Sequence, residues 1–175
     1  MSDWWTYSLS DFLLFSPSTY FRLFALYNAA IWPAHLLAVA LGAGMLAVLA
    51  RPAARWQVRL VCVLLALVWL WVAWGYLLTR YATINWAASY LAVTFVVQAG
   101  LFLVMGMMVR QGGFVHSATG RRRLGLGLVG FALFVYPFIP LMTGRSISQA
   151  EVFAIAPDPT VLATLGMVLM EPRTH

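Results

Sequence analysis

Three sets of polar residues in this apolar chain have the types and spacings that suit hydrogen bonding to a small molecule. The first set lies four and three residues apart, so that one helix face carries all of it: Asn28, Trp32 and His35. The second recurs every four residues: Tyr90, Thr94 and Gln98. The third belongs to the connecting loops: Arg80, Tyr81, Asn85, Arg145, Glu151 and Asp158. Polar groups are rare inside membranes, so such sets are reasonable site candidates.

Each set also has a structural explanation. If all three lie at one depth, they line an outward-open vestibule with Gln98 at its floor. The second set can instead hydrogen-bond neighbouring helices, each bond being worth less than ~2 kcal/mol. His35 can bond a carbonyl freed by Pro33, and Arg80 can pair with a loop carboxylate for about 0–1 kcal/mol. The sequence leaves both interpretations open.

The residues that most enzymes and metal sites need are missing or scattered. Haem requires axial ligands at matched depth, but His35 is expected near the outer edge, His116 in an inner loop and His175 in the tail. No HExxH motif or aspartate-rich site is present, and Cys62 is the single cysteine. We therefore expect a non-enzymatic protein with no catalytic residues, no cofactor and no metal.

The composition and the hydropathy pattern indicate an integral membrane protein. Hydrophobic residues make up 63% of the 175 residues and charged residues 9%, against about half and about a quarter in soluble proteins. Long apolar runs separated by short charged loops predict an all-α, polytopic transmembrane bundle. The length allows one domain, residues 1–175. The net charge of +6 does not indicate nucleic-acid binding, because the arginines gather where membrane orientation needs them.

The arginines predict the topology. Two loops, Arg51–Arg59 and Arg110–Arg123, hold seven arginines and no acidic residue, and cytoplasmic loops are the ones that collect positive charge. This predicts an inner-membrane protein with its N-terminus outside. Three consecutive arginines are expected to contact anionic inner-leaflet lipid: Arg121, Arg122 and Arg123. Every tryptophan and tyrosine except Trp56 then falls in or near the outer half.

The expected elements follow from this topology. Residues 1–16 suit an interfacial helix, after which Ser16 and Pro17 begin a new one. Four full spans are expected at about 24–50, 58–78, 88–109 and 124–142, followed by a half-length fifth helix at 159–170. Pro33 should kink the first span near the outer boundary.

Glycines near the start of the fourth span suit close helix packing: Gly125, Gly127 and Gly130. The last apolar run is only about half a bilayer long. It is either a half-helix packed inside the bundle or a truncated span completed by a partner.

Several stretches resemble an uncharacterised family of bacterial multi-pass membrane proteins, described as a domain of unknown function. They are the opening SDWWTYSLSDFLLFSPSTYFRLFALYNAAIWPAHL, YATINWAA (Tyr81–Ala88) and AEVFAIAPDPT (Ala150–Thr160). Members of that family continue through further hydrophobic helices after the PDPT motif, whereas this chain ends at His175. The resemblance implies a membrane location and supplies no catalytic residue.

Two functions compete. The first is an accessory or structural subunit that docks its aromatic and polar outer face on a larger membrane complex, with the bilayer and other subunits (or another copy of itself) as partners. The alternative is a small-solute binding or transport protein that uses the outward-facing vestibule.

Overall fold

The computed structural model describes residues 16–51, 54–109, 114–115, 119–170 and 173–174. Within these ranges the regular secondary structure is helical, apart from the pairing of two short strands, β1 (Phe114–Val115) and β2 (Arg173–Thr174). The interfacial helix expected before Ser16 lies outside the described residues.

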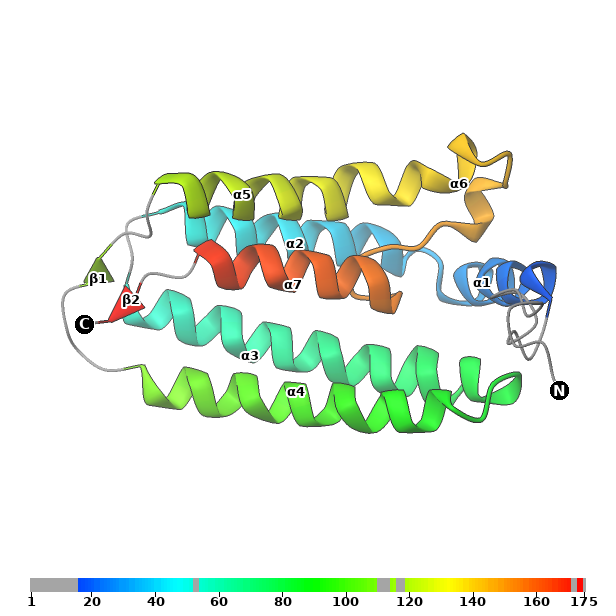
Figure 1. The fold of residues 1–175 in the computed structure, drawn as a ribbon, viewed down its shortest axis with the longest axis horizontal. Coiled ribbons are helices and arrows are strands. Elements are labelled where there is room, and N and C mark those ends of the chain that lie inside the picture. The colour runs from blue at the N-terminus through cyan, green and yellow to red at the C-terminus, as the bar shows by residue number, and fades with distance from the viewer. Residues whose placement is uncertain (1–15, 52–53, 110–113, 116–118, 171–172, 175) are drawn as a thin grey trace, which may run out of the picture.

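Long helices run side by side along the molecule, with α1 at the end opposite β1 and β2 (Figure 1). The main helices are α1 (Pro17–Ile31), α2 (Ala34–Ala50), α3 (Arg55–Trp71), α4 (Ala88–Met108), α5 (Thr119–Gly130), α6 (Ile139–Met142) and α7 (Pro157–Met170). Wider π-helical segments extend α3 and α5: η3 (Val72–Leu78) and η5 (Phe131–Val135). Single 3-10 turns complete the connections: η4 (Tyr81–Thr83), η6 (Tyr136–Phe138) and η7 (Ile147–Gln149).

Three helices in the described ranges are long and apolar enough to cross a membrane: Arg55–Thr83, Ala88–Met108 and Thr119–Met142. A fourth span is obtained if α1 and α2 together count as one. The structure therefore confirms the all-helical class and gives three to four apolar helices of spanning length.

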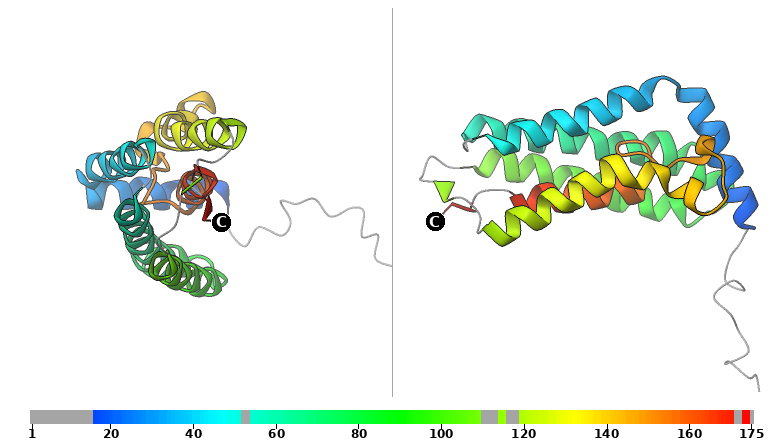
Figure 2. Two further views of the ribbon diagram at one scale, coloured as in Figure 1. Left: turned by 90° about the vertical axis from the view of Figure 1, so that its left-hand side faces the viewer. Right: turned by 90° about the horizontal axis from the view of Figure 1, so that it is seen from above.

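The first long apolar stretch is two helices rather than one. Ser16 caps α1 by accepting the Thr19 backbone N–H, and Pro17 occupies the first turn, as predicted. The peptide bond between Trp32 and Pro33 is cis, and the axes of α1 and α2 differ by 88°. The break expected at Pro33 is thus a right-angled elbow, and α1 lies across the end of the bundle (Figure 2).

Helices α5 and α7 approach each other through glycine. A Cβ atom on Gly166 would lie 2.7 Å from the Gly125 carbonyl oxygen and 2.7 Å from Val129 Cγ2. Gly125 therefore has the close-packing role that the sequence suggested, with α7 as the partner. Gly127 and Gly130 do not share it, because a Cβ atom on either would meet nothing within 4 Å.

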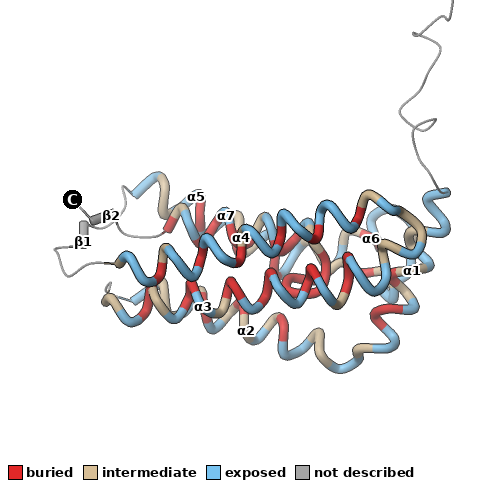
Figure 3. Tube along the Cα trace, turned by 90° about the horizontal axis from the view of Figure 1, so that it is seen from below, coloured by how far each residue is buried: buried red, intermediate tan, exposed pale blue. Residues whose placement is uncertain are grey.

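Helix α7 lies on the inside of the curve formed by α5, α2, α3 and α4, as the end-on view of Figure 2 shows. Buried residues gather where these helices face one another (Figure 3). The shortness of α7 matches the expectation of a half-helix packed inside the bundle, although it begins at Pro157, two residues earlier than expected.

The chain that leads from α6 to α7 is irregular and partly buried. We call residues 146–156 the linking segment, of which Val152, Phe153, Ala154, Ile155 and Ala156 are all buried. Ala154 has a left-handed φ of 65°, a conformation that costs a residue with a Cβ roughly 1–2 kcal/mol. Buried irregular backbone needs hydrogen-bond partners from elsewhere in the molecule, and these partners include predicted site residues.

Candidate functional site

The elbow between α1 and α2 brings Asn28 and His35 together. The Asn28 side-chain amide donates to the backbone carbonyls of Ser148 and Ala150, both at 2.8 Å. Its Oδ1 lies 3.0 Å from His35 Nε2. The sequence predicted that these residues share one helix face, but they belong to different helices. The sharp turn at Pro33 creates the contact.

These bonds determine which atoms remain free for a ligand. Because both Asn28 amide protons are used on carbonyls, Oδ1 is an acceptor and His35 Nε2 must donate to it. His35 Nδ1 is buried and has no hydrogen-bond partner among the described residues. The indole of Trp32 lies beside the imidazole, with ring centroids 6.0 Å apart, and is 66% exposed.

A cavity of about 530 Å³ adjoins this pair, and we call it the elbow cavity. Asn28, Trp32 and His35 line one side, and residues around Phe138 and Ile147 line the other. The first predicted set is therefore assembled at a cavity.

The second set lies elsewhere. Tyr90, Thr94 and Gln98 are absent from the lining of the elbow cavity. Tyr90 is 68% exposed, and Thr94 is exposed and donates to the Leu91 carbonyl of its own helix. Tyr90 and Thr94 lie on the side of α4 opposite the face that packs on α3, which carries Ala92, Phe95 and Ala99. Gln98 is half-buried at the edge of that packing face. The elbow cavity therefore brings the first set together without the second.

Aromatic rings join α1 to the end of α3. The Phe24 and Tyr76 rings stack at 4.8 Å, and Tyr20 lies 5.1 Å from Phe24 and 5.6 Å from Tyr81. Arg80, expected to pair with a loop acid, has its guanidinium 5.8 Å from the Tyr27 ring centroid. These rings hold α1 across the bundle end.

Two further residues of the third set stabilise the turn before α4. Asn85 donates to the Tyr81 hydroxyl at 3.1 Å, and Asn85 Oδ1 accepts the Ala87 backbone N–H at 3.0 Å. The hydrogen bonds of Asn85 are therefore local to the turn, whereas Tyr81 also contacts the Tyr20 ring of α1.

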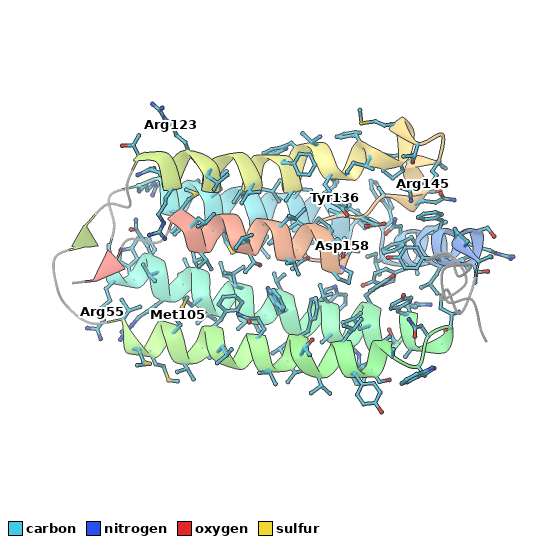
Figure 4. The ribbon with its side chains drawn as sticks, viewed as in Figure 1. Arg55, Met105, Arg123, Tyr136, Arg145 and Asp158 are labelled. Atoms are coloured by element: carbon cyan, nitrogen blue, oxygen red, sulfur yellow. The ribbon has the colours of Figure 1, made fainter. Side chains whose placement is uncertain are left out.

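The Glu151 and Asp158 side chains both lie within hydrogen-bonding distance of the Tyr136 hydroxyl. Tyr136 Oη lies 3.4 Å from a carboxylate oxygen of each, and Figure 4 shows Tyr136 beside Asp158 near the start of α7. Burial raises the pKa of the Glu151 carboxyl, and the Asp158 carboxylate raises it further. The Arg145 guanidinium and the Tyr136 hydroxyl act in the opposite direction. Glu151 thus holds a proton more tightly than an ordinary glutamate.

The arginines gather at the other end of the molecule, where Figure 4 places Arg55 and Arg123. Arg122 donates to the Ala50 carbonyl at 2.9 Å, which ties α5 to the end of α2. Arg59 donates to the Gly106 carbonyl at 3.3 Å and lines a second cavity of about 540 Å³ between α3 and α4. Arg121 and Arg123 lie near the start of α5, where Arg121 is half-buried and Arg123 is exposed.

Two threonines of α7 that the sequence did not single out make buried side-chain hydrogen bonds. Thr160 accepts the Ala154 backbone N–H at 2.9 Å and donates to the Ala156 carbonyl. Thr164 accepts from the indole N–H of Trp69 at 3.0 Å. Their spacing of four residues, on one face of an apolar helix, was the available signal.

No group of three or more His, Cys, Asp or Glu side chains that would suit a metal ion occurs in the part of the chain that the structure describes. The geometry defines an all-helical protein with a polar elbow, an acidic pair and an arginine-rich opposite end. Residues 18–175 match a family of unknown function (DUF6064), and the chain belongs to that family. Comparison with curated proteins and with solved structures finds no match.

Proposed function

We propose that the protein crosses a bacterial inner membrane four times, with its N-terminus outside. The bent pair α1 and α2 supplies the first crossing, in which α2 is the helix that runs along the bundle. The 17 residues of α2 extend about 25 Å, close to the hydrocarbon thickness of about 30 Å. Arginines at the end of α2 and the beginnings of α3 and α5 support an inner position for that end, with Arg121–Arg123 against anionic lipid.

Within the membrane, we propose a non-enzymatic accessory or structural subunit that docks on a larger complex. The polar stripe of α4 carries this proposal, because the described residues leave Tyr90 and Thr94 exposed and Gln98 half-buried. A polar side chain facing lipid is unfavourable, and such residues normally face protein or water. A partner helix against Tyr90, Thr94 and Gln98 would give these groups a protein environment.

Site-specific photo-crosslinking of the full chain in its native membrane tests this proposal. A photoreactive residue at Thr94 should capture a defined protein, while one at the exposed Leu126 of α5 serves as the control. The same protein should remain bound through extraction in a mild detergent, and Gln98→Leu should weaken its retention. A lone monomer with lipid adducts only at both positions would refute the docking role.

The alternative, a solute pathway, receives less support. It requires the elbow residues and the α4 stripe to face a common cavity, and the elbow cavity contains none of the α4 residues. Binding of a molecule at the elbow alone is a narrower hypothesis.

A further inference from the structure

The elbow cavity has the size and lining of a small-molecule site. Its volume of about 530 Å³ lies within the range of about 300–1,000 Å³ that is common for ligand pockets. Most of its lining is apolar, with Leu36, Phe138 and Ile147 among the contributors. No charged side chain is present among the described residues that line it. A ligand here needs an apolar body and few polar groups.

The polar group that the ligand needs follows from His35. Nε2 donates to Asn28 Oδ1, and the lining offers no carboxylate to hold a positively charged imidazolium. The ring is therefore neutral, and Nδ1 carries a lone pair that no described residue meets. A hydrogen-bond donor is required, since an anion would face that lone pair and an ammonium ion would lack a counter-charge.

The rim of the cavity indicates where the ligand comes from. Trp32, Leu36, Phe138 and Ile147 are 66%, 63%, 53% and 50% exposed, so apolar side chains surround the opening. Such a rim suits entry from lipid. This step rests on the membrane location proposed above and is independent of docking through α4.

We propose that the elbow cavity binds an uncharged, membrane-resident amphiphile with a free hydroxyl group. The hydroxyl donates to His35 Nδ1, and the apolar body lies along Leu36, Phe138 and Ile147. His35 Nδ1 is closed to solvent in this structure, so the hydroxyl reaches it through a side-chain movement, which we assign to the exposed Trp32 indole beside the imidazole. Asn28 positions the imidazole by fixing the donor role of Nε2.

Photolabelling of the full-length protein in phosphatidylcholine nanodiscs tests the proposal. The probe is decanol carrying a diazirine on its chain, and the matched probe is its methyl ether, which has the same body and no donor. Alcohol labelling should map to the peptides around Leu36 and Ile147 and should be competed by plain decanol. The ether should label about tenfold less at equal concentration, the difference that one hydrogen bond makes.

Three variants make the test specific. His35→Phe should abolish the difference between alcohol and ether. Ala29→Phe narrows the cavity without altering the Asn28–His35 pair and should lower labelling, whereas Ala30→Phe, at an exposed neighbour outside the lining, should leave it unchanged.

Two results would overturn the inference: equal labelling by alcohol and ether in the unaltered protein, or a difference that survives His35→Phe. Labelling that Ala29→Phe leaves unchanged would also overturn it. Insertion into the discs is scored first by co-elution, so a failure of the membrane location is distinguished from a failure of the ligand site.

Discussion

The α5–α7 contact and the linking segment both bury backbone, but the buried peptide groups find their hydrogen-bond partners in different ways. Helices α5 and α7 satisfy their own peptide groups, so their close approach needs only the absence of side chains at Gly125 and Gly166. The linking segment has irregular backbone, and it draws on the side chains of Asn28 and Thr160 for hydrogen bonds.

The difference teaches how to interpret polar residues in an apolar protein. Asn28 belongs to a candidate binding site, yet both of its amide protons stabilise backbone from a distant part of the chain. Thr160 has only this structural role in the described contacts. A buried polar residue beside irregular backbone is explained first by its hydrogen bonds to that backbone. Only a polar atom that has no hydrogen-bond partner among the described residues, such as His35 Nδ1, indicates a ligand.

Asn28→Leu should produce the largest loss of stability. It leaves two peptide carbonyls and His35 Nε2 without their partner. The bond to the Ala150 carbonyl is buried and the other two are partly buried, and an unmet buried group costs about 1–3 kcal/mol. We expect the free energy of unfolding in detergent to fall by about 3 kcal/mol, measured by chemical denaturation. Gln98→Leu, a similar change on α4, is the control. A small effect of Asn28→Leu would mean that the linking segment does not depend on side-chain hydrogen bonds.

Gly166→Ala should produce the next largest effect. The added methyl group would meet the Gly125 carbonyl oxygen at 2.7 Å, so α5 and α7 must separate, at a cost of about 1–3 kcal/mol. Thermal unfolding in detergent measures this loss. Gly127→Ala, where the methyl group meets nothing within 4 Å, should be neutral or stabilising by up to about 1 kcal/mol. Equal behaviour of the two variants would contradict glycine-dependent packing.

Glu151→Gln should change how stability depends on pH. Because the pKa of Glu151 is raised in the folded protein, folding is favoured by protonation, and stability declines as pH rises from the ordinary value of 4.5 through the raised pKa. Glutamine does not titrate, so the variant should lose this decline. Melting temperatures across that pH range provide the measurement. Asp158→Asn removes one cause of the shift and should flatten the profile in part; an unchanged profile in Glu151→Gln would exclude this carboxyl as the source.

Arg145→Gln should have the smallest effect. The Arg145 guanidinium carbon lies 3.9 Å from the Phe21 ring centroid, and a cation–π contact of this kind contributes about 0.5–1 kcal/mol at an exposed site. A double-mutant cycle with Phe21→Leu isolates the pair, and Arg22→Gln at an exposed neighbouring position is the control. A coupling energy near zero would show that this cation–π contact does not help to hold α1 in place.

Local signals predicted much of the helical framework. Ser16 and Pro17 begin α1 as expected, because capping and the fixed φ of proline act within one turn. The break at Pro33 also follows from local chemistry. The 88° angle at that break does not, because it depends on the rings of α1 packing against Tyr76 and Tyr81.

The candidate site was only partly predictable. The sequence singled out Asn28 and His35 but assigned them to one helix face and joined them with the α4 stripe in one vestibule. It missed Thr160, since nothing local shows that a buried irregular segment would need a hydroxyl. Gly125 was recognised as a packing glycine, but its partner Gly166, on a different helix, was not.

The sequence by itself determined the all-helical class, the apolar lengths and the clustering of arginines, since hydropathy, capping and charge are properties of short stretches of chain. Tertiary structure alone decided that α1 lies across the bundle and that α7 packs inside it. It also decided that the Asn28 amide donates to the linking segment, while His35 Nδ1 has no hydrogen-bond partner among the described residues. These outcomes depend on contacts between residues up to 122 positions apart, and no local rule specifies which distant carbonyl a buried amide will meet.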